Sequence, residues 1–499
     1  MAEHQDSTSI RLEKLAKLRE HGVNPFPYRF AFTHRAEQLQ KEGDALAAAG
    51  TEVRLAGRVM AVRRQGKTAF AHVKDNHHRL QVYIRQDEVG PEAFERFELV
   101  DLGDYIGLTG QMMRTKTGEM TLRAKTWELL SKAIRPLPIP KVEEHDGQKI
   151  VHQQVKDVEF RYRQRYADLA LNDDVAQVFR QRTRIIHEVR GYLLDHEFLE
   201  VETPALQTIY GGASATPFTT TLKALDLPLF LRVATELYLK RLVVGGFDRV
   251  FEIGKNFRNE GMDRSHNPEF TMVEFYQAYA DYADMMAHFE AIWERAALAV
   301  HGKTTFEYQG VTLDVKRPWA RLTMHEAIQK FGGPDVDALD DQALRAAVLQ
   351  HHGQIEGEFN RGLAIAQLFE HIAEPKLQQP TFIIDFPKET TPLCKAHRSK
   401  PGLVERFEPY IMGFEVGNAY SELNDPQVQK ALFEEQVARR KGGELETHPF
   451  DADFIRAMEY GMPPMGGVGI GLDRMIMLLT NQHSLRDVLF FPTMRPEQE

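Results

Sequence analysis

Residues 250–279, VFEIGKNFRNEGMDRSHNPEFTMVEFYQAY, constrain the fold most, because two alternating segments flank a short polar loop. Side chains in a strand alternate between two faces, so residues two apart share a face. From Glu252 onward one face is polar and includes Arg258, whereas the other carries Phe251 and Ile253. The pattern predicts an antiparallel hairpin with one core face and one polar face.

The residue types on the polar face are unusual for a face that water covers. A solvated sheet face is also charged, and this is the simpler interpretation, but such faces favour Lys, Glu and Thr. Here Arg258 and His266 accompany Glu260, Glu274 and Phe270. Arginine binds carboxylates and phosphates through two parallel hydrogen bonds, and an aromatic ring stacks on a base. The face therefore predicts a site where a nucleotide and a carboxylic acid meet.

A second hairpin is predicted at residues 404–425, VERFEPYIMGFEVGNAYSELND, with its turn near residues 412–413. This turn places Glu408 and Glu415 roughly opposite one another. The pair could be an accidental surface pair, but two facing carboxylates repel. Divalent cations bound to a polyphosphate explain the pair better.

The alternation of side chains along the second strand of this hairpin places the candidate residues on different faces. Asn418, Tyr420 and Glu422 share one face, and Glu415 does not share it. If all four side chains serve one site, the strand must contain a bulge. Gly417 is the candidate position, since glycine is common at bulges.

The composition limits the class of protein. The 499 residues predict two or three domains, and the 42% hydrophobic content is that of a folded globular chain. No run of about 18 apolar residues is present, which argues against a membrane span, and the opening residues lack the apolar stretch of a signal peptide. The single cysteine, Cys394, excludes a disulfide framework, and together these features indicate the cytoplasm. The net charge of −10 disfavours nucleic-acid binding overall but hides local basic patches.

Changes in composition divide the chain into segments. Residues 1–50 read as a helical extension, and five short strand-like segments in 51–133 predict a small β-barrel. A proline-rich linker is expected at 134–160. The rest, 161–499, reads as a mixed α and β domain with helices concentrated around 322–375. Near its end PPMGGVGIGLDRMIMLL predicts a glycine-rich strand that leads into an apolar helix.

Three segments in order resemble the three motifs of the class II aminoacyl-tRNA synthetases. They are the helix that leads to FLEVETP, then FRNE with HNPEF, and then GIGLDR. The resemblance is closest to the bacterial lysyl-tRNA synthetases and covers nearly the whole chain, through phrases such as NPFPYRF, IYGGASATPF, HRSKPGLVERFE and NAYSELNDP. Signatures of the HIGH and KMSKS type, which mark the class I enzymes, are absent.

The resemblance implies a fold, a reaction and partners. The fold is an α+β antiparallel sheet flanked by helices, preceded by an OB barrel that reads the anticodon. The reaction joins L-lysine to ATP as lysyl-adenylate and passes the lysyl group to the terminal ribose of tRNA(Lys). As many as three Mg²⁺ ions would accompany ATP. A homodimer would form through the helix at about 174–196 and the strand that ends at Pro204.

The resemblance also implies a role for individual residues. Arg258 would bind the lysine carboxylate and the α-phosphate, and Arg474 would bind the γ-phosphate or one face of adenine. The other expected ATP ligands are Glu260, His266 and Phe270, with Mg²⁺ on Glu408 and Glu415. The expected lysine ligands are Gly212 and Glu236 at the α-amino group, and Glu274, Tyr276, Asn418, Tyr420 and Glu422 around the side chain. The expected anticodon-binding residues are Arg58, Phe70 and Gln81.

Alternatives remain open at several positions. Phe70 could belong to the barrel core, and Glu422 could pair with a lysine or arginine of the chain. The sequence also departs from the family at Thr216, Ser265 and Met465, and Arg264 is displaced by one position from the usual arginine. Two rival functions are a degenerate synthetase-like RNA-binding protein and the paralogue that lysylates a translation factor. The first would have lost Arg258, Arg474 or the Glu408/Glu415 pair, and the second lacks the barrel.

Overall fold

The computed structural model describes residues 2–139, 141–145, 148–152, 157–355, 359–441 and 449–497. These residues form two compact units, Met1–Ala176 and Gln177–Glu499. None of the helices in the described ranges is long and apolar enough to cross a membrane.

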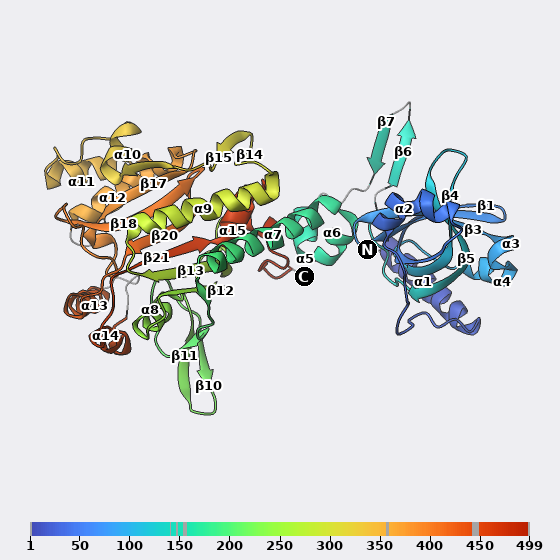
Figure 1. The fold of residues 1–499 in the computed structure, drawn as a ribbon, viewed down its shortest axis with the longest axis horizontal. Coiled ribbons are helices and arrows are strands. Elements are labelled where there is room, and N and C mark those ends of the chain that lie inside the picture. The colour runs from blue at the N-terminus through green and yellow to red at the C-terminus, as the bar shows by residue number, and fades with distance from the viewer. Residues whose placement is uncertain are drawn as a thin grey trace. The chain divides into compact units, whose positions relative to one another are not determined.

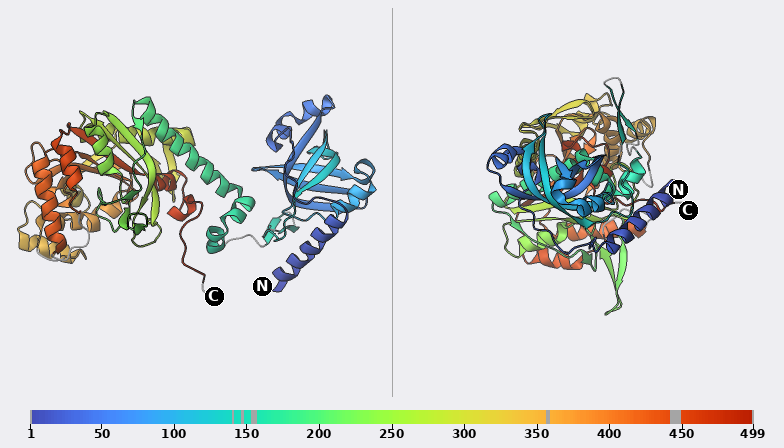
Figure 2. Two further views of the ribbon diagram at one scale, coloured as in Figure 1. Left: turned by 90° about the horizontal axis from the view of Figure 1, so that it is seen from below. Right: turned by 90° about the vertical axis from the view of Figure 1, so that its right-hand side faces the viewer.

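The N-terminal unit contains the predicted barrel, which closes in the strand order β1-β2-β3-β5-β4 (Figures 1 and 2). Buried residues such as Val53, Ala69 and Leu122 fill its interior. The strands are β1 (Glu52–Gln65), β2 (Thr68–Asp75), β3 (His78–Arg85), β4 (Tyr105–Arg114) and β5 (Met120–Ser131). The helices are α1 (Ala2–Glu20), α2 (Ala36–Ala48), α3 (Gln86–Val89) and α4 (Pro91–Phe97).

The segment expected to be a linker holds a two-stranded antiparallel ladder. Strand β6 (Lys141–His145) pairs with β7 (Gln148–His152), and each strand is only five residues long. Short strands flanked by proline-rich sequence give little periodic signal, so the sequence did not predict them. Helices α5 (Val158–Arg163) and α6 (Arg165–Leu171) follow.

The second unit is built on a large, mainly antiparallel sheet. Among the described residues the order is β16-β17-β18-β20-β21-β13-β12-β8, with β19 paired to β18. Its strands are β8 (Leu199–Glu200), β12 (Arg249–Phe257), β13 (Glu269–Ala278), β16 (Ala320–Thr323), β17 (Thr381–Pro387), β18 (Leu403–Ile411), β19 (Phe414–Glu415), β20 (Gly417–Ser421) and β21 (Met465–Gly471). Smaller ladders are β9 (Leu206–Gln207) with β10 (Thr219–Leu222) and β11 (Leu227–Leu231), and β14 (Thr305–Tyr308) with β15 (Val311–Asp314).

Helices cover this sheet and supply most of its core. Figure 1 shows α9 (Tyr282–His301) running along the sheet. The buried Phe289 and Trp293 of α9 pack with Phe382 and Phe407 of the sheet. The other helices are α7 (Asp173–Asp195), α8 (Glu236–Val244), α10 (Met324–Lys330), α11 (Asp341–Gln350), α12 (Arg361–Ile372), α13 (Pro426–Lys441), α14 (Ala452–Glu459), α15 (Leu472–Leu479) and α16 (Leu485–Val488).

The first predicted hairpin is confirmed as β12–β13. The two strands pair antiparallel from Arg249 opposite Gln277 to Phe257 opposite Glu269. Phe251 lies in the core as expected. The polar face is largely buried rather than solvated, because Glu252, Asn256 and Glu274 are each about 95% or more buried. The interpretation as a simple solvated face is therefore wrong.

The second hairpin and its bulge are also confirmed. Tyr410 pairs with Glu415, and further along Phe407 pairs with Ala419. Two residues of β18 lie between these pairs, whereas three residues, 416–418, lie on the partner strand. The extra residue moves Glu415 onto the face that carries Asn418. Gly417, the predicted position, is one of the three bulge residues.

Candidate active site

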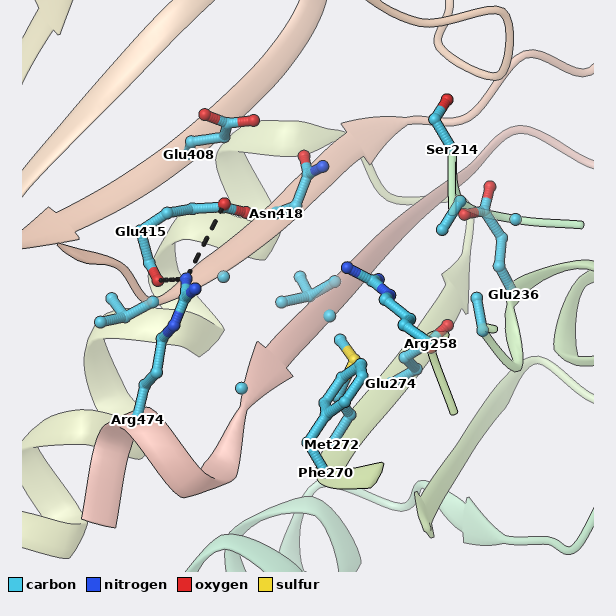
Figure 3. A pocket seen from close by; sticks show the side chains of 18 of the residues that line it. Ser214, Glu236, Arg258, Phe270, Met272, Glu274, Glu408, Glu415, Asn418 and Arg474 are labelled. Atoms are coloured by element: carbon cyan, nitrogen blue, oxygen red, sulfur yellow. Dashed lines mark hydrogen bonds and ion pairs between the residues drawn. The ribbon is translucent and has the colours of Figure 1, made fainter. Parts of the chain in front are cut away.

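A cavity of about 430 Å³ opens on the polar face of the sheet. Its walls come from β13, β18, β20, β21, the segment between β12 and β13, and the segments around α8 and α15 (Figure 3). The cavity brings together every residue that the sequence assigned to lysine, ATP or metal: Gly212, Glu236, Arg258, Glu260, His266, Phe270, Glu274, Tyr276, Glu408, Glu415, Asn418, Tyr420, Glu422 and Arg474.

Two arginines lie at separate positions in this cavity. Figure 3 shows Arg258 between the part that contains Arg474 and the part that contains Glu236. The Arg258 guanidinium carbon lies 5.0 Å from the centre of the Phe270 ring, and the buried Nε of Arg258 has no hydrogen-bond partner in the described part of the chain. Arg474 donates from Nη1 to the Glu415 backbone oxygen at 2.6 Å. A buried, unpaired guanidinium nitrogen is a ready donor for an anionic ligand.

Glu408 and Glu415 form an acidic pair near Arg474. Arg406 Nη2 donates to Glu408, and the Tyr410 hydroxyl donates to the same carboxylate at 2.6 Å. Enclosure in the protein and the charge of Glu408 raise the pKa of Glu415, while Arg474 and Arg406 oppose the shift. Two carboxylates that disfavour each other's ionisation are suited to a divalent cation.

The chemistry of this pair fits Mg²⁺ that arrives with a nucleotide. Mg²⁺ in such sites is usually held by one or two carboxylates together with substrate phosphates and water. Within the described residues no cluster of three or more His, Cys, Asp or Glu side chains could hold a metal by itself. Glu408 and Glu415 therefore suit a metal whose other ligands come from the substrate.

The opposite end of the cavity is acidic and closely walled. One Glu274 oxygen accepts hydrogen bonds from the Thr235 backbone N–H at 3.1 Å and from Asn256 Nδ2 at 3.3 Å. The Tyr276 hydroxyl donates to the other oxygen at 3.4 Å. Burial raises the pKa of Glu274, and Glu236 adds to the shift. A cationic ligand would relieve this unfavourable concentration of negative charge.

Two glycines make room for this end of the cavity. Gly212 has φ of +86°, and a Cβ there would lie 2.9 Å from the Cβ of Glu236. A Cβ on Gly467 would lie 2.2 Å from Glu422 Oε1 and 2.3 Å from the Tyr276 ring. Gly467 therefore allows Glu422 and Tyr276 to approach the backbone of β21.

Glu422 is paired with a lysine of the chain. Lys240 Nζ lies 2.5 Å from Glu422 Oε2 and 2.5 Å from Glu236 Oε1, and both Lys240 and Glu422 are 1% exposed. The alternative considered for Glu422 is thus partly confirmed, since the pair exists. Glu422 nevertheless also lines the cavity, so the pair does not remove it from the site.

The barrel presents a mixed aromatic and polar face. Phe70 is half-buried, lies outside the barrel core and stacks on Tyr83 with the ring centres 4.6 Å apart. Gln81, two residue pairs further along the β2–β3 ladder, donates from Nε2 to Glu119 at 2.6 Å. Arg58 lies opposite Lys74, four residues from Phe70, and its guanidinium packs 4.5 Å from the Tyr105 ring centre. The alternative that Phe70 belongs to the barrel core is therefore wrong.

Comparisons with known proteins decide the family. A family model for class II tRNA synthetases (D, K and N) matches residues 157–495, and a model for an OB-fold nucleic acid binding domain matches 53–130. The chain belongs to the class II tRNA synthetases. It is 49% identical over 497 residues to a lysine–tRNA ligase of Methanoculleus marisnigri, which covers 99% of this chain and 96% of the relative. A lysine–tRNA ligase of Moorella thermoacetica is 48% identical over 495 residues, or 99% of each chain.

Sequence reasoning missed two residues at the synthetase cavity: Arg406 lines it, and Lys240 is buried behind its wall without lining it. Arg406 lies two residues before Glu408 on the same strand, and its Nε donates to Asn418 Oδ1 at 3.2 Å. Lys240 lies one helical turn after Glu236 on α8. Both positions follow from local spacing, since residues two apart share a strand face and residues four apart share a helix face. That spacing does not predict their partners on other elements, which are Asn418 for Arg406 and Glu422 for Lys240.

Of the departures from the family pattern, the position of Arg264 is the clearest. Its Nη2 donates to the His483 backbone oxygen at 3.1 Å, and it does not line the synthetase cavity. Ser265 does line the cavity, and Met465 is fully buried in the core beside it. Thr216 donates its backbone N–H to Glu260 at 3.4 Å. Ser265 therefore lines the cavity at the sequence position of the usual arginine, whereas Arg264, one position earlier, bonds the chain outside the cavity.

Proposed function

We propose that this class II synthetase activates L-lysine with ATP and transfers the lysyl group to the 3′ end of tRNA(Lys). The observation that carries the proposal is a single cavity with an acidic end and a phosphate end, which Arg258 lies between. The relatives named lysine–tRNA ligase support the same choice of amino acid.

The proposed chemistry depends on position and charge. Arg258 binds the lysine carboxylate and the α-phosphate, so that the carboxylate oxygen attacks phosphorus and pyrophosphate leaves. Phe270 stacks on adenine, while His266 and Glu260 hold the nucleotide and Arg474 contacts its far end. The attacking carboxylate is already ionised at neutral pH, so no general base is needed.

Glu408 and Glu415 are the proposed ligands of Mg²⁺, and the ion would neutralise phosphate charge when it is bound. Arg406 and Tyr410 hold the Glu408 carboxylate from the protein side. This arrangement leaves the cavity side of the pair for the metal.

The acidic end is the proposed lysine pocket. Gly212 and Glu236 bind the α-amino group, and Glu274, Tyr276, Asn418, Tyr420 and Glu422 surround the side chain. The pocket rejects aspartate because a third carboxylate would meet buried carboxylates without a compensating cation.

The test of the activity is exchange of labelled pyrophosphate into ATP with purified protein. We expect exchange to require lysine, with arginine, ornithine, aspartate and asparagine as controls. Exchange that is equally supported by aspartate, or that never responds to any amino acid, would contradict the proposal. The second result would favour a synthetase-like RNA-binding protein instead.

The barrel is the proposed anticodon reader, with Phe70 as a stacking residue and Arg58 and Gln81 as polar contacts. OB sheets bind single-stranded bases by stacking and by edge hydrogen bonds. Replacing Phe70 with alanine should weaken tRNA charging by roughly 1–3 kcal/mol. Adenylate formation should be unchanged, because the cavity lies in the other unit. Equal losses in charging and in pyrophosphate exchange would indicate a structural role.

A homodimer is proposed through α7 and β8. Strand β8 pairs with β12 alone among the described strands, which leaves a sheet edge open. Leu194, Leu199 and Leu206 nearby are each 46–52% exposed. An open edge with exposed leucines favours association with another chain.

Replacing Leu199 with glutamate should weaken this dimer by at least about 2 kcal/mol, because the charge would be buried in the interface. Light scattering at micromolar concentration measures the change. Leu349→Glu is the matched control, since Leu349 is 57% exposed on α11. A wild-type protein that is monomeric in this measurement would refute the proposed assembly.

We propose that anticodon binding and catalysis belong to separate domains, with the limits expected from the sequence. Residues 1–50 extend the barrel of 51–133, a linker occupies 134–160, and 161–499 carry catalysis with a helical insertion at about 322–375. The proposed site of action is the cytoplasm, where tRNA, ATP and lysine occur together.

A further inference from the structure

Lys240 is a buried cation at the back of the amino-acid pocket, and it has no part in the chemistry described so far. It lies on α8, is 1% exposed and does not line the cavity. Its ammonium contacts Glu236 and Glu422, each at 2.5 Å. It also lies 5.9 Å from the centre of the Tyr276 ring. Lys240 therefore joins the carboxylates proposed to bind the two ends of the substrate.

The charges of the pocket can be counted from these contacts. Glu236, Glu274 and Glu422 are at least 95% buried, and Lys240 is the cation that contacts two of them. With all four groups ionised the net charge is −2. Arg406 pairs with Glu408, and Arg258 faces the substrate carboxylate, so neither completes this balance. Buried charge that is not neutralised is strongly unfavourable.

We propose that Lys240 is a specificity-determining residue. Lys240 neutralises one of the three buried carboxylates, so the pocket is neutral only when the ligand carries two positive charges. Without Lys240 the three carboxylates would require three cations, and with a second protein cation they would require one. A dibasic amino acid supplies two, through its α-ammonium and its side-chain ammonium. This inference rests on the proposed function and explains why a pocket for a cationic substrate contains a lysine of its own.

The titration of Glu422 gives the inference a measurable consequence. Burial raises the pKa of Glu422 to about 8, with Lys240 opposing the shift and Glu236 and Glu274 adding to it. Burial opposes the charge of Lys240, but Glu236 and Glu422 raise its pKa above the ordinary value. The groups that interact with Glu422 are Glu236 and Lys240 from α8, Glu274 and Tyr276 from β13, and Cys394. Tyr420 from β20 and Arg406 from β18 line the same cavity.

The direction of the pH dependence follows from these contacts. Below a pH of about 8 the free pocket keeps a proton on Glu422, and lysine must displace it. The KM for lysine should therefore fall as the pH rises and level off near that value. Lys240→Met removes the opposing cation, so the levelling point should move up by about one to three pH units.

Three variants, assayed by pyrophosphate exchange from about pH 6 to about pH 10, test Lys240 itself. Lys240→Met should show the displaced profile with little change in the KM for ATP. Lys240→Arg keeps the charge and should retain the wild-type levelling point. Arg241→Met is the control, because Arg241 follows Lys240 on α8 and pairs instead with Asp451 at 2.7 Å. A Lys240→Met profile that is raised equally at every pH would overturn the inference, since that result indicates only a structural role.

A second experiment uses the unmodified protein and does not depend on a variant that folds. Norleucine has the α-ammonium of lysine but a methyl group in place of the side-chain ammonium. Its complex should therefore keep one more proton on the pocket carboxylates than the lysine complex does. The ratio of the norleucine inhibition constant to the lysine KM should rise by up to about tenfold per pH unit between about pH 7 and pH 9. A ratio that does not change with pH would overturn the inference.

Different results would refute the proposed function and the proposed role of Lys240. Exchange that does not depend on lysine in the wild-type protein would refute the proposed function. Lysine-dependent exchange with unchanged profiles in Lys240→Met, or with a pH-independent norleucine ratio, would refute only the role of Lys240.

Discussion

Replacing Arg258 with alanine should reduce lysine-dependent pyrophosphate exchange by roughly 10²–10³-fold. Arg258 is proposed to contact both reacting groups, and its buried Nε has no hydrogen-bond partner among the residues that the structure describes. The loss should therefore appear mainly in kcat, because the contact gains strength as charge develops at phosphorus. Single-turnover formation of adenylate measures this step directly.

Arg264→Ala is the matched control for this experiment. It removes an arginine from the same loop region, but Arg264 bonds the His483 backbone oxygen outside the cavity. We expect near wild-type exchange. A loss as large as that of Arg258→Ala would show that the loop acts as one unit, and the assignment of Arg258 to the reacting atoms would then be wrong.

Replacing Glu422 with glutamine should raise the KM for lysine and lower kcat/KM by about 2–4 kcal/mol. The amide cannot neutralise the side-chain ammonium, and Lys240 would be left with Glu236 as its carboxylate partner. The KM for ATP should change little, because the nucleotide end of the cavity is formed by other residues. Steady-state exchange kinetics with lysine and ATP varied separately provide the measurement.

Glu290→Gln is the control for burial alone. Glu290 is 4% exposed on α9 and accepts a hydrogen bond from the Trp319 backbone N–H at 2.9 Å, away from the cavity. This variant should lose stability without a selective rise in the KM for lysine. Normal lysine activation by Glu422→Gln would place amino-acid specificity elsewhere in the pocket.

Alternation alone predicted the two hairpins and the face that each presents. The core face of β13, with Val273 and Phe275, and the cavity face, with Glu274 and Tyr276, follow directly from the period of two. The bulge was predicted because parity separated Glu415 from Asn418, while their chemistry required one site. Local geometry of this kind can be read from one segment at a time.

The contacts between distant segments could not be read in this way. Glu236 and Lys240 are visible as a pair one helical turn apart, but nothing in α8 indicates that Glu422 completes the triad. Arg406 similarly shares a face with Glu408, yet its bond to Asn418 depends on how β18 and β20 pair. Such contacts are set by tertiary packing, for which a single sequence has no periodic signal. The resemblance to a known family predicted that these distant segments meet in one site. The cavity contains the residues that the resemblance assigned to lysine, ATP and metal.

The bulge at residues 416–418 makes chain length part of the site. Deleting Val416 or Gly417 would restore a regular ladder and turn the Glu415 side chain to the opposite face, although every residue with a proposed role would still be present. Two chains could thus share all the residues proposed to bind lysine and ATP and yet differ in whether the acidic pair can assemble. Spacing between these residues carries information about activity that their identities alone do not.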